Sequence, residues 1–235
     1  MADLITLGIE TATMQGGVAI IGPEGSVAEI RLNVKAAHSE RLLPAIDYLL
    51  GQTGLDMGQI DLLAVSAGPG SFTGLRVGLG LLKGMAYAFP EKKVVAVPTL
   101  EAFAWRLPFC SSPVCPLLDA RKGELYGGIF RWNGDGFYRL VPESVLPPDG
   151  WIKAAAGVLG PESDKIILSG EGARIYRERF RAGLGEKALF APLEITPSAA
   201  CVALLGARMA AGGRLAGPAT LVPIYIRKSE AEMKK

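Results

Sequence analysis

The segment with the clearest chemical potential is a glycine-rich loop at residues 68–76, which lies between a β-rich run and an apolar helix. Such a loop can direct backbone N–H groups at an anion, and the dipole of the following helix favours negative charge there. The loop lacks the Gly-Lys-Ser/Thr ending of a P-loop, so it is not a Walker motif. A phosphate or nucleotide contact and a plain strand-to-helix turn, with glycines chosen for positive φ, both fit the pattern. The candidate anion contacts are Thr11, Thr13, Gly68, Gly70, Ser71, Thr73, Gly74 and Arg76.

A second candidate is the polar turn at residues 119–124, between two predicted strands. Asp119 ends the first of these strands, and Glu124 begins the second. Arg121 is placed to pair with a carboxylate across the turn, although such a surface ion pair contributes only about 0–1 kcal/mol. Asp119, Arg121 and Glu124 therefore form a candidate functional site, with an ordinary polar turn as the alternative.

Metal and nucleophile chemistry have little support. The single histidine, His38, is followed by Ser39 and Glu40, which is too small a ligand set for a metal ion. A catalytic triad would depend on this one histidine, and no Gly-x-Ser-x-Gly elbow is present. The simplest interpretation is that Ser39 caps a helix and His38 lies just ahead of it. The three cysteines include no Cys-x-x-Cys pair, so neither a disulfide framework nor a zinc site is expected.

The composition is that of a globular protein with one large or two small domains. The 235 residues include 25 basic and 23 acidic side chains, a net charge of +2. A protein that binds RNA by itself usually has a basic patch, whereas the basic pairs here, at 227–228 and 234–235, lie in a tail interpreted as solvated. If RNA is a ligand, most contacts with its phosphates are therefore expected to come from another subunit. The longest apolar stretch, residues 77–89, is too short to span a membrane, and the start does not resemble a signal peptide, so a cytoplasmic protein is expected.

The order of elements predicts an α/β fold with an internal repeat. In the first half, three strands at 4–10, 17–21 and 27–32 form an antiparallel meander, and the later strands are parallel with helical crossovers. The other predicted elements there are helix 39–50 with Pro44 in its first turn, strand 61–67, helix 74–89, strand 94–97 and a helix starting at 99–105.

The second half partly repeats this order. Its predicted elements are strands 114–118, 126–131 and 137–141, helix 151–158, strand 166–169, helix 173–182 with Ile175, Tyr176 and Phe180 inward, and helix 198–211 with Pro197 at its first position. The expected lobes are residues 1–108 and 109–195, with a helix and tail at 196–235 that could return to the first lobe.

The helix after the glycine loop is apolar nearly all round, so it should be buried on more than one side. It also contains Gly78, Gly80 and Gly84, and each interior glycine costs about 1 kcal/mol relative to alanine. Close approach of another element would offset that cost, and a subunit interface is favoured over packing within one domain. The predicted interface consists of Leu42, Leu43, Ile46, Leu49, Leu50, Leu75, Val77, Gly78, Leu81, Leu82, Gly84, Met85 and Ala88.

Five segments of the chain resemble, in order, the TsaB (YeaZ) family, and the resemblance covers nearly the whole sequence. The glycine loop with its helix is the most specific of them. The segments are residues 7–13, 38–42, 68–76, 119–121 and 223–227. One departure is Glu10, where many relatives carry Asp; the charge is kept and the side chain reaches further.

The resemblance implies an actin-like ATPase (ribonuclease H-like) fold of two duplicated β-β-β-α-β-α lobes. It also implies an essential non-catalytic subunit that pairs with TsaD, the homologue that transfers threonylcarbamoyl to the adenosine beside the tRNA anticodon. TsaE, an ATPase, completes the assembly. By this resemblance the chain reaches tRNA only indirectly, pairs with itself when alone, and requires no cofactor, while ATP or ADP belongs to the complex.

TsaD-like proteins place a His-x-x-x-His metal pair just after the strand that follows the glycine-loop helix. The matching positions here are Thr99 and Phe103, which are not metal ligands, so no metal site is predicted. A rival function is that of a metabolite kinase of the same fold, which would need ATP hydrolysis and a catalytic aspartate such as Asp119. A second rival is a homodimeric interaction module without nucleotide. A third is a peptidase, for which the metal pair and the triad are both missing.

Overall fold

The computed structural model describes residues 4–34, 36–160 and 164–227. They divide into two lobes. The first lobe consists of the residues up to Ala102 together with Pro197–Ile224. The second lobe consists of Phe103–Thr196 and the segment from Tyr225. The divisions therefore lie at 102/103 and 196/197, rather than at the expected 108/109 and 195/196.

The first lobe is built on a five-stranded sheet in the order β3-β2-β1-β4-β5. Strands β1 and β2 pair antiparallel, as do β2 and β3, while β4 pairs parallel to both β1 and β5. This confirms the predicted meander and the parallel crossovers. The strands are β1 Thr6–Glu10, β2 Gly16–Gly22, β3 Gly25–Leu32, β4 Leu62–Gly68 and β5 Lys93–Pro98.

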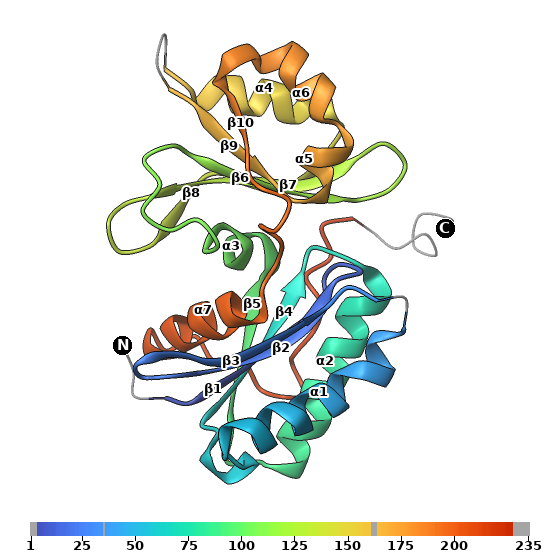
Figure 1. The fold of residues 1–235 in the computed structure, drawn as a ribbon, viewed down its shortest axis with the longest axis vertical. Coiled ribbons are helices and arrows are strands. Elements are labelled where there is room, and N and C mark those ends of the chain that lie inside the picture. Colours follow the sequence, from blue (N-terminus) through green and yellow to red (C-terminus); the bar gives the residue numbers. More distant parts are fainter. Residues whose placement is uncertain (1–3, 35, 161–163, 228–235) are drawn as a thin grey trace. The chain divides into compact units, whose positions relative to one another are not determined.

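The two faces of this sheet carry different side chains. Large aliphatic residues such as Leu7, Ile9 and Leu63 pack against α1 (His38–Thr53) and α2 (Phe72–Ala88). On the other face lies α7 (Ala199–Ala211), which is alanine-rich and contacts β1, β2 and β4 (Figure 1).

Small residues make this second face close-packed. Ala19, Gly8 and Ala64 form one row across three strands. A Cβ on Gly8 would lie 2.8 Å from the Ala203 Cβ, and one on Gly206 would lie 2.6 Å from the Ala64 Cβ. The sheet and α7 therefore approach at a distance that larger side chains would prevent.

The second lobe repeats this plan. Its sheet has the order β10-β9-β6-β7-β8, in which β6–β7 and β7–β8 are antiparallel and β9 is parallel to both β6 and β10. Both sheets thus have the order 3-2-1-4-5 by position within the lobe, as expected for the duplicated actin-like fold. The strands are β6 Val114–Asp119, β7 Leu125–Trp132, β8 Phe137–Leu146, β9 Ile166–Ser169 and β10 Ala188–Phe190.

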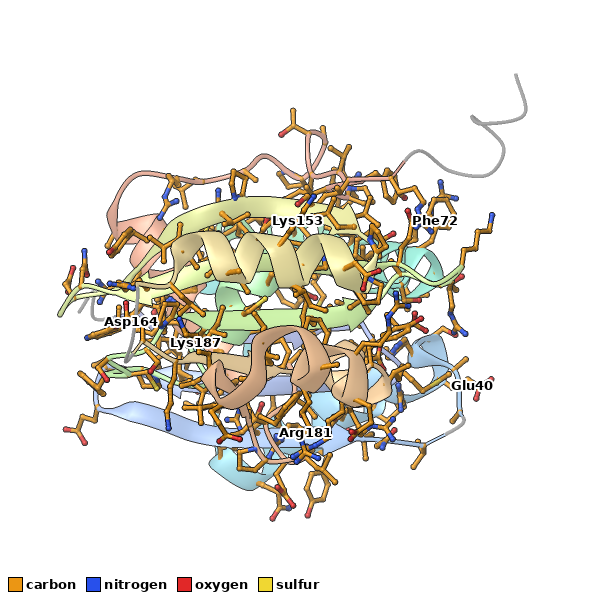
Figure 2. The ribbon with its side chains drawn as sticks, turned by 90° about the horizontal axis from the view of Figure 1, so that it is seen from above. Glu40, Phe72, Lys153, Asp164, Arg181 and Lys187 are labelled. Atoms are coloured by element: carbon orange, nitrogen blue, oxygen red, sulfur yellow. The ribbon has the colours of Figure 1, made fainter. Side chains whose placement is uncertain are left out.

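The helices α4 (Pro148–Val158) and α6 (Arg177–Leu184) lie in front of this sheet in Figure 2. Trp151 and Phe180 are fully buried in its core. The remaining elements are α3 Thr99–Ala104, α5 Glu171–Ile175 and two 3₁₀ turns, Met57–Gln59 and Gly185–Lys187.

Some predicted helix boundaries are wrong. The helix predicted at 173–182 is broken at Tyr176 into α5 and α6, which leaves Ile175 51% exposed instead of inward. Helix α1 begins at His38 with Ala37 as its N-cap, so Ser39 does not cap it and Pro44 lies beyond the first turn. Pro197 lies outside α7, because Ser198 is the N-cap and accepts a hydrogen bond from the Cys201 N–H.

None of the helices that the structure describes combines the length and the apolar character needed to cross a membrane.

Candidate functional site

The glycine loop packs backbone to backbone against the loop that follows β1. A Cβ on Gly70 would lie 2.6 Å from the Ala12 carbonyl oxygen, and one on Gly74 would collide with the Thr11 carbonyl. The Ser71 N–H donates to the Ala12 carbonyl over 2.6 Å. Close approach within the lobe therefore explains these glycines without any ligand.

The loop also uses its polar groups internally. The Gly68 N–H donates to Thr99 Oγ1 over 3.0 Å, and the Gly74 N–H donates to Ser71 Oγ over 3.2 Å. Together with Ser71, three loop N–H groups are engaged within the first lobe, and they are not free to hold an anion. Among the predicted anion contacts, Ser71, Thr73 and Arg76 are exposed and Gly70 is half-buried, whereas Thr11, Thr13, Gly68 and Gly74 are buried.

Glu10, at the end of β1, is a buried carboxyl group beside this loop. One oxygen, Oε1, accepts the Ala12 N–H over 2.5 Å, and the Ser66 hydroxyl also bonds to the carboxyl. The other oxygen, Oε2, is buried with no hydrogen-bond partner among the described residues. Burial raises the pKa of Glu10 from 4.5 to about 7, against the opposing effect of these hydrogen bonds.

His38 and Arg41 form a buried polar network at the start of α1. Arg41 donates to the carbonyls of Met14, Leu32 and Val34 over 2.6–3.2 Å. It also bonds His38 Nδ1 over 2.8 Å, so that Nδ1 accepts and Nε2–H donates to the Thr13 carbonyl over 2.9 Å.

The His38 imidazole is therefore neutral, and its burial lowers its pKa. Arg41 is only 7% exposed. Nothing in the local sequence pattern distinguishes it from a solvated helix residue, so its role was not predictable from sequence.

The predicted interface on α1 and α2 divides into a buried and an accessible part. The prediction is wrong for seven residues, because they face the core of their own lobe. These buried residues are Leu42, Ile46, Leu49, Leu75, Gly78, Leu82 and Met85. The accessible residues are Leu43, Gly84 and Ala88, which are exposed, and Leu50, Val77 and Leu81, which are half-buried.

Glycines 78, 80 and 84 differ in whether a side chain would fit at each position. A side chain at Gly78 would collide with Thr11 of the first loop, whereas a Cβ on Gly80 or Gly84 would have no atom within 4 Å. Gly78 is therefore explained by packing inside the lobe. For Gly80 and Gly84, the described residues of the first lobe offer no such explanation.

The turn after β6 is held in an unusual backbone conformation. Arg121, Lys122 and Gly123 all have positive φ, at 64°, 54° and 77°. The Asp119 carboxylate accepts the Arg121 N–H over 2.9 Å, while the Arg121 Nε lies 4.0 Å away on an 85% exposed side chain. The Arg121 pairing is therefore peripheral.

Arg227 is the stronger partner of this turn. Its guanidinium donates to the Ala120 carbonyl over 2.7 Å and pairs with the Glu124 carboxylate. The interpretation of this part of the tail as solvated is wrong for Arg227, while residues 228 and 234–235 lie outside the described residues. Near the turn, Glu171 Oε1 accepts the Asp119 N–H over 3.4 Å, and burial together with the Asp119 charge raises the pKa of Glu171.

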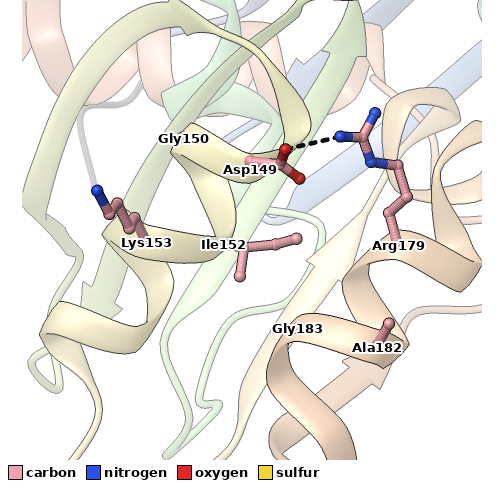
Figure 3. Close-up of a pocket in the computed structure, with 7 residues that line it drawn as sticks. All are labelled: Asp149, Gly150, Ile152, Lys153, Arg179, Ala182 and Gly183. Atoms are coloured by element: carbon pink, nitrogen blue, oxygen red, sulfur yellow. Dashed lines mark hydrogen bonds and ion pairs between the residues drawn. The ribbon is translucent and has the colours of Figure 1, made fainter.

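A shallow pocket, not predicted from sequence, lies between α4 and α6 (Figure 3). At its rim, Arg179 pairs with Asp149 over 2.7 Å, and both side chains are more than half exposed. Gly183 is required there because its Cβ would lie 2.6 Å from an Ile152 methyl group. These features describe ordinary helix packing, with an exposed ion pair worth about 0–1 kcal/mol.

Comparison with known proteins places this architecture in a family. Residues 28–235 match the family model of TsaD, described as tRNA N6-adenosine threonylcarbamoyltransferase. The tRNA threonylcarbamoyladenosine biosynthesis protein TsaB of Bacillus subtilis is 27% identical over 97% of this chain and 96% of its own length. TsaB of Haemophilus influenzae is 32% identical over 76% of each chain.

A solved structure agrees with these relatives. YeaZ from Pseudomonas aeruginosa superposes with a TM-score of 0.77 at 25% identity, covering 94% of this chain and 99% of that one. With its two duplicated actin-like lobes, the chain belongs to the TsaB (YeaZ) family, whose members are named as tRNA threonylcarbamoyladenosine biosynthesis proteins.

Proposed function

We propose that this chain is the non-catalytic subunit of a tRNA threonylcarbamoyl transferase complex, and that it pairs with a TsaD homologue through the outer face of α1 and α2. A TsaE homologue completes the complex, and tRNA reaches this chain mainly through its partners. The observation that carries the proposal is an apolar, glycine-notched helical surface that nothing in the first lobe covers.

We define this outer face by the accessible residues of the two helices. Leu43 and Tyr48 of α1 are 57% and 60% exposed, and Tyr87 of α2 is 67% exposed. The α2 positions recur every three or four residues and so lie on one side of the helix. The outer face consists of Leu43, Tyr48, Val77, Gly80, Leu81, Gly84, Tyr87 and Ala88.

Two glycines of the outer face, Gly80 and Gly84, support the proposal that a partner covers it. Each interior helix glycine costs about 1 kcal/mol relative to alanine, so Gly80 and Gly84 together cost roughly 2 kcal/mol. No contact within the first lobe offsets that cost, since the space above both residues is open. A second protein whose backbone or side chains enter this space would account for them.

The same surface could pair with a second copy of the chain, because an isologous contact needs only self-complementarity. A stable interface requires about 800 Å² from each partner, and two adjacent helices can provide that area. Figure 1 shows α1 and α2 side by side on one face of the first sheet. Self-pairing is therefore the state we propose for the chain alone.

Two positions support a non-catalytic role. Thr99 and Phe103 stand where the resemblance to TsaD places a metal-binding histidine pair. The Thr99 side chain is fully buried and accepts the Gly68 N–H, and Phe103 is 1% exposed. Both side chains serve the packing of the chain. The engaged N–H groups of the glycine loop likewise support the proposal that this chain alone needs no nucleotide, and that ATP or ADP acts in the complex.

The test uses Gly84→Leu, with Gly157→Leu as its matched control. Gly157 lies on α4 and is exposed, and a Cβ added there would likewise have no atom within 4 Å. Both changes raise helix propensity, so neither should unfold the protein. In size-exclusion chromatography, Gly84→Leu should lose pairing with the TsaD homologue, and Gly157→Leu should keep it.

Reconstitution completes the test. The TsaD and TsaE homologues should modify tRNA with the wild-type chain and the Gly157→Leu control, and only weakly with Gly84→Leu or without the chain. Normal pairing by Gly84→Leu, or tRNA modification by this chain unaided, would refute the proposal.

A further inference from the structure

The two helices that carry the outer face have opposite charges at their surfaces. The acidic residues of α1 are Glu40 and Asp47, and both are exposed. The basic residues of α2 are Arg76, which is exposed, and Lys83, which is half-buried. Arg41 of α1 is buried against backbone carbonyls, and α2 contains no acidic residue. The surface of α1 is therefore acidic, and that of α2 is basic.

The charges on the two helices have the same spacing. Glu40 and Asp47 are seven residues apart on α1, and Arg76 and Lys83 are seven residues apart on α2. Seven residues are nearly two helical turns, so the two charges of each helix lie on the same side of it, about 10 Å apart along its axis. The acidic pair of one helix therefore matches the basic pair of the other in spacing.

The two helices also run in the same direction. Strands β3, β4 and β5 are parallel to one another, because β3 and β1 both pair antiparallel with β2, and β4 is parallel to β1 and β5. Helix α1 joins β3 to β4 and α2 joins β4 to β5, so both begin at the same end of the sheet (Figure 1). Asp47 is the tenth residue of α1 and Lys83 the twelfth of α2. Their levels along the helices therefore differ by only about 3 Å.

Asp47 and Lys83 have no charged partner in their own lobe. Among the residues that the structure describes, neither side chain forms an ion pair or a hydrogen bond. An exposed charge can be satisfied by water alone. The match of sign, spacing and level between α1 and α2 is the feature that indicates a protein partner, because electrostatic complementarity fixes the register of a contact.

We infer that two copies of the chain pair about a twofold axis parallel to α1 and α2, so that Asp47 of each copy faces Lys83 of the other. This axis exchanges the two helices and keeps their levels, so each acidic position meets a basic one. An axis perpendicular to the helices would set α1 against α1 and bring like charges together, which is unfavourable. The inference rests on the proposed function, which makes the outer face the pairing surface.

The charges and the apolar residues then have different tasks. The leucines, tyrosines and glycines of the outer face supply contact area, and the charges select the orientation. Symmetry places two contacts between Asp47 and Lys83 in each dimer, which doubles the effect of any change. Glu40 and Arg76 lie in the first turns of their helices, at the end of the contact, where water and salt screen charges more strongly. Asp47 and Lys83 are therefore the residues to test.

Analytical ultracentrifugation of the full-length chain at about 50 mM salt measures the dissociation constant of the dimer. Asp47→Lys should raise this constant tenfold or more, because the new lysine faces Lys83 of the second copy at both contacts. Lys83→Glu should have the same effect, because the new glutamate faces Asp47. A tenfold change corresponds to about 0.7 kcal/mol at each of the two contacts.

An equimolar mixture of the two variants provides the decisive measurement. In a mixed dimer the new lysine of one chain faces the new glutamate of the other, and the remaining Asp47 faces the remaining Lys83. Both contacts are attractive again, so the mixture should pair within about threefold of wild type. Such a rescue also shows that both variants are folded.

Glu24→Lys and Lys153→Glu are the matched controls. They make the same changes of charge at exposed positions away from α1 and α2. Each should pair like wild type. Raising the salt concentration to about 500 mM should bring Asp47→Lys and Lys83→Glu closer to wild type, since salt screens the repulsion.

Three results would overturn the inference. The first is a wild-type chain that remains monomeric, and the second is a mixture that pairs no better than either variant alone. The third is a dimer of Asp47→Lys with wild type that is tighter than the wild-type dimer, which would show that Asp47 faces Asp47. Gly84→Leu separates the two proposals: if it loses TsaD pairing while the charge variants self-pair normally, the proposed function stands and only this inference fails.

Discussion

The buried carboxyl of Glu10 makes a quantitative prediction about how stability depends on pH. Its pKa is about 7 in the folded chain, compared with 4.5 ordinarily. The folded state therefore keeps a proton that the unfolded state has already released between these values. Unfolding releases that proton, so the contribution of Glu10 to stability is complete below about pH 4.5 and is lost as pH rises through about 7.

The size of the effect follows from the pKa difference. One pKa unit corresponds to about 1.4 kcal/mol, so a difference of about 2.5 units corresponds to roughly 3 kcal/mol. For a chain of this length, roughly 3 kcal/mol changes the melting temperature by about 6–12 °C. Above about pH 7 the loss is complete, and stability no longer changes because of this group.

Glu10→Gln tests the prediction because glutamine has the shape of the protonated acid. Its Oε1 can still accept the Ala12 N–H, as Glu10 does over 2.5 Å. The variant should match wild type in urea unfolding near pH 5, and should be more stable by up to about 3 kcal/mol near pH 8.

Glu40→Gln, at an exposed position of α1, is the control and should follow wild type at both pH values. If the difference between Glu10→Gln and wild type is the same near pH 5 and near pH 8, Glu10 does not carry a proton in the folded chain and the reasoning fails.

Three further predictions concern packing and polar contacts. Gly8→Val should destabilise the first lobe by about 1–3 kcal/mol in urea unfolding, because its Cβ would lie 2.8 Å from the Ala203 Cβ; Gly51→Val, which has normal φ and open space, is the control and should be nearly neutral. Arg227→Ala should speed amide hydrogen exchange at residues 120–124, because the Ala120 carbonyl and the Glu124 carboxylate lose their shared donor. Equal exchange rates would show that Arg227 does not hold this turn. His38 has a lowered pKa, so the stability it contributes is complete above about pH 6.5 and falls as the medium becomes more acidic; His38→Gln should flatten that part of the unfolding profile, and an unchanged profile would contradict the assignment.

The sequence predicts most of the first lobe because periodicity and turn residues agree there. Short apolar runs mark the strands of the meander, and the turn signal at residues 22–25 separates β2 from β3. The break between α5 and α6 was not predictable in this way, since Tyr176 carries no helix-breaking signal. The three-residue strand β10 is too short to produce a pattern.

The candidate sites show a similar limit. The apolar residues of α2 are recognisable from sequence, but which of them face the core depends on how the helix is rotated against the sheet. Arg41 and Arg227 donate hydrogen bonds to backbone carbonyls of residues that lie elsewhere in the sequence. No local sequence pattern predicts such contacts. The ring contacts of Trp105 with Trp132 and Phe137 join residues about 30 positions apart, and they form only when the segment after α3 packs against β7 and β8.

The return of α7 to the first sheet has a consequence for how the chain folds during synthesis. The second lobe is one nearly continuous stretch, Phe103–Thr196, whereas the first lobe needs Pro197–Ile224 to cover its other face. A ribosome therefore delivers the complete second sheet while Gly8, Ala19 and Ala64 still lack their covering helix. The first lobe is therefore synthesised first but completed last. In the nascent polypeptide, the small-residue face of its sheet stays uncovered until α7 has been synthesised and packs against it.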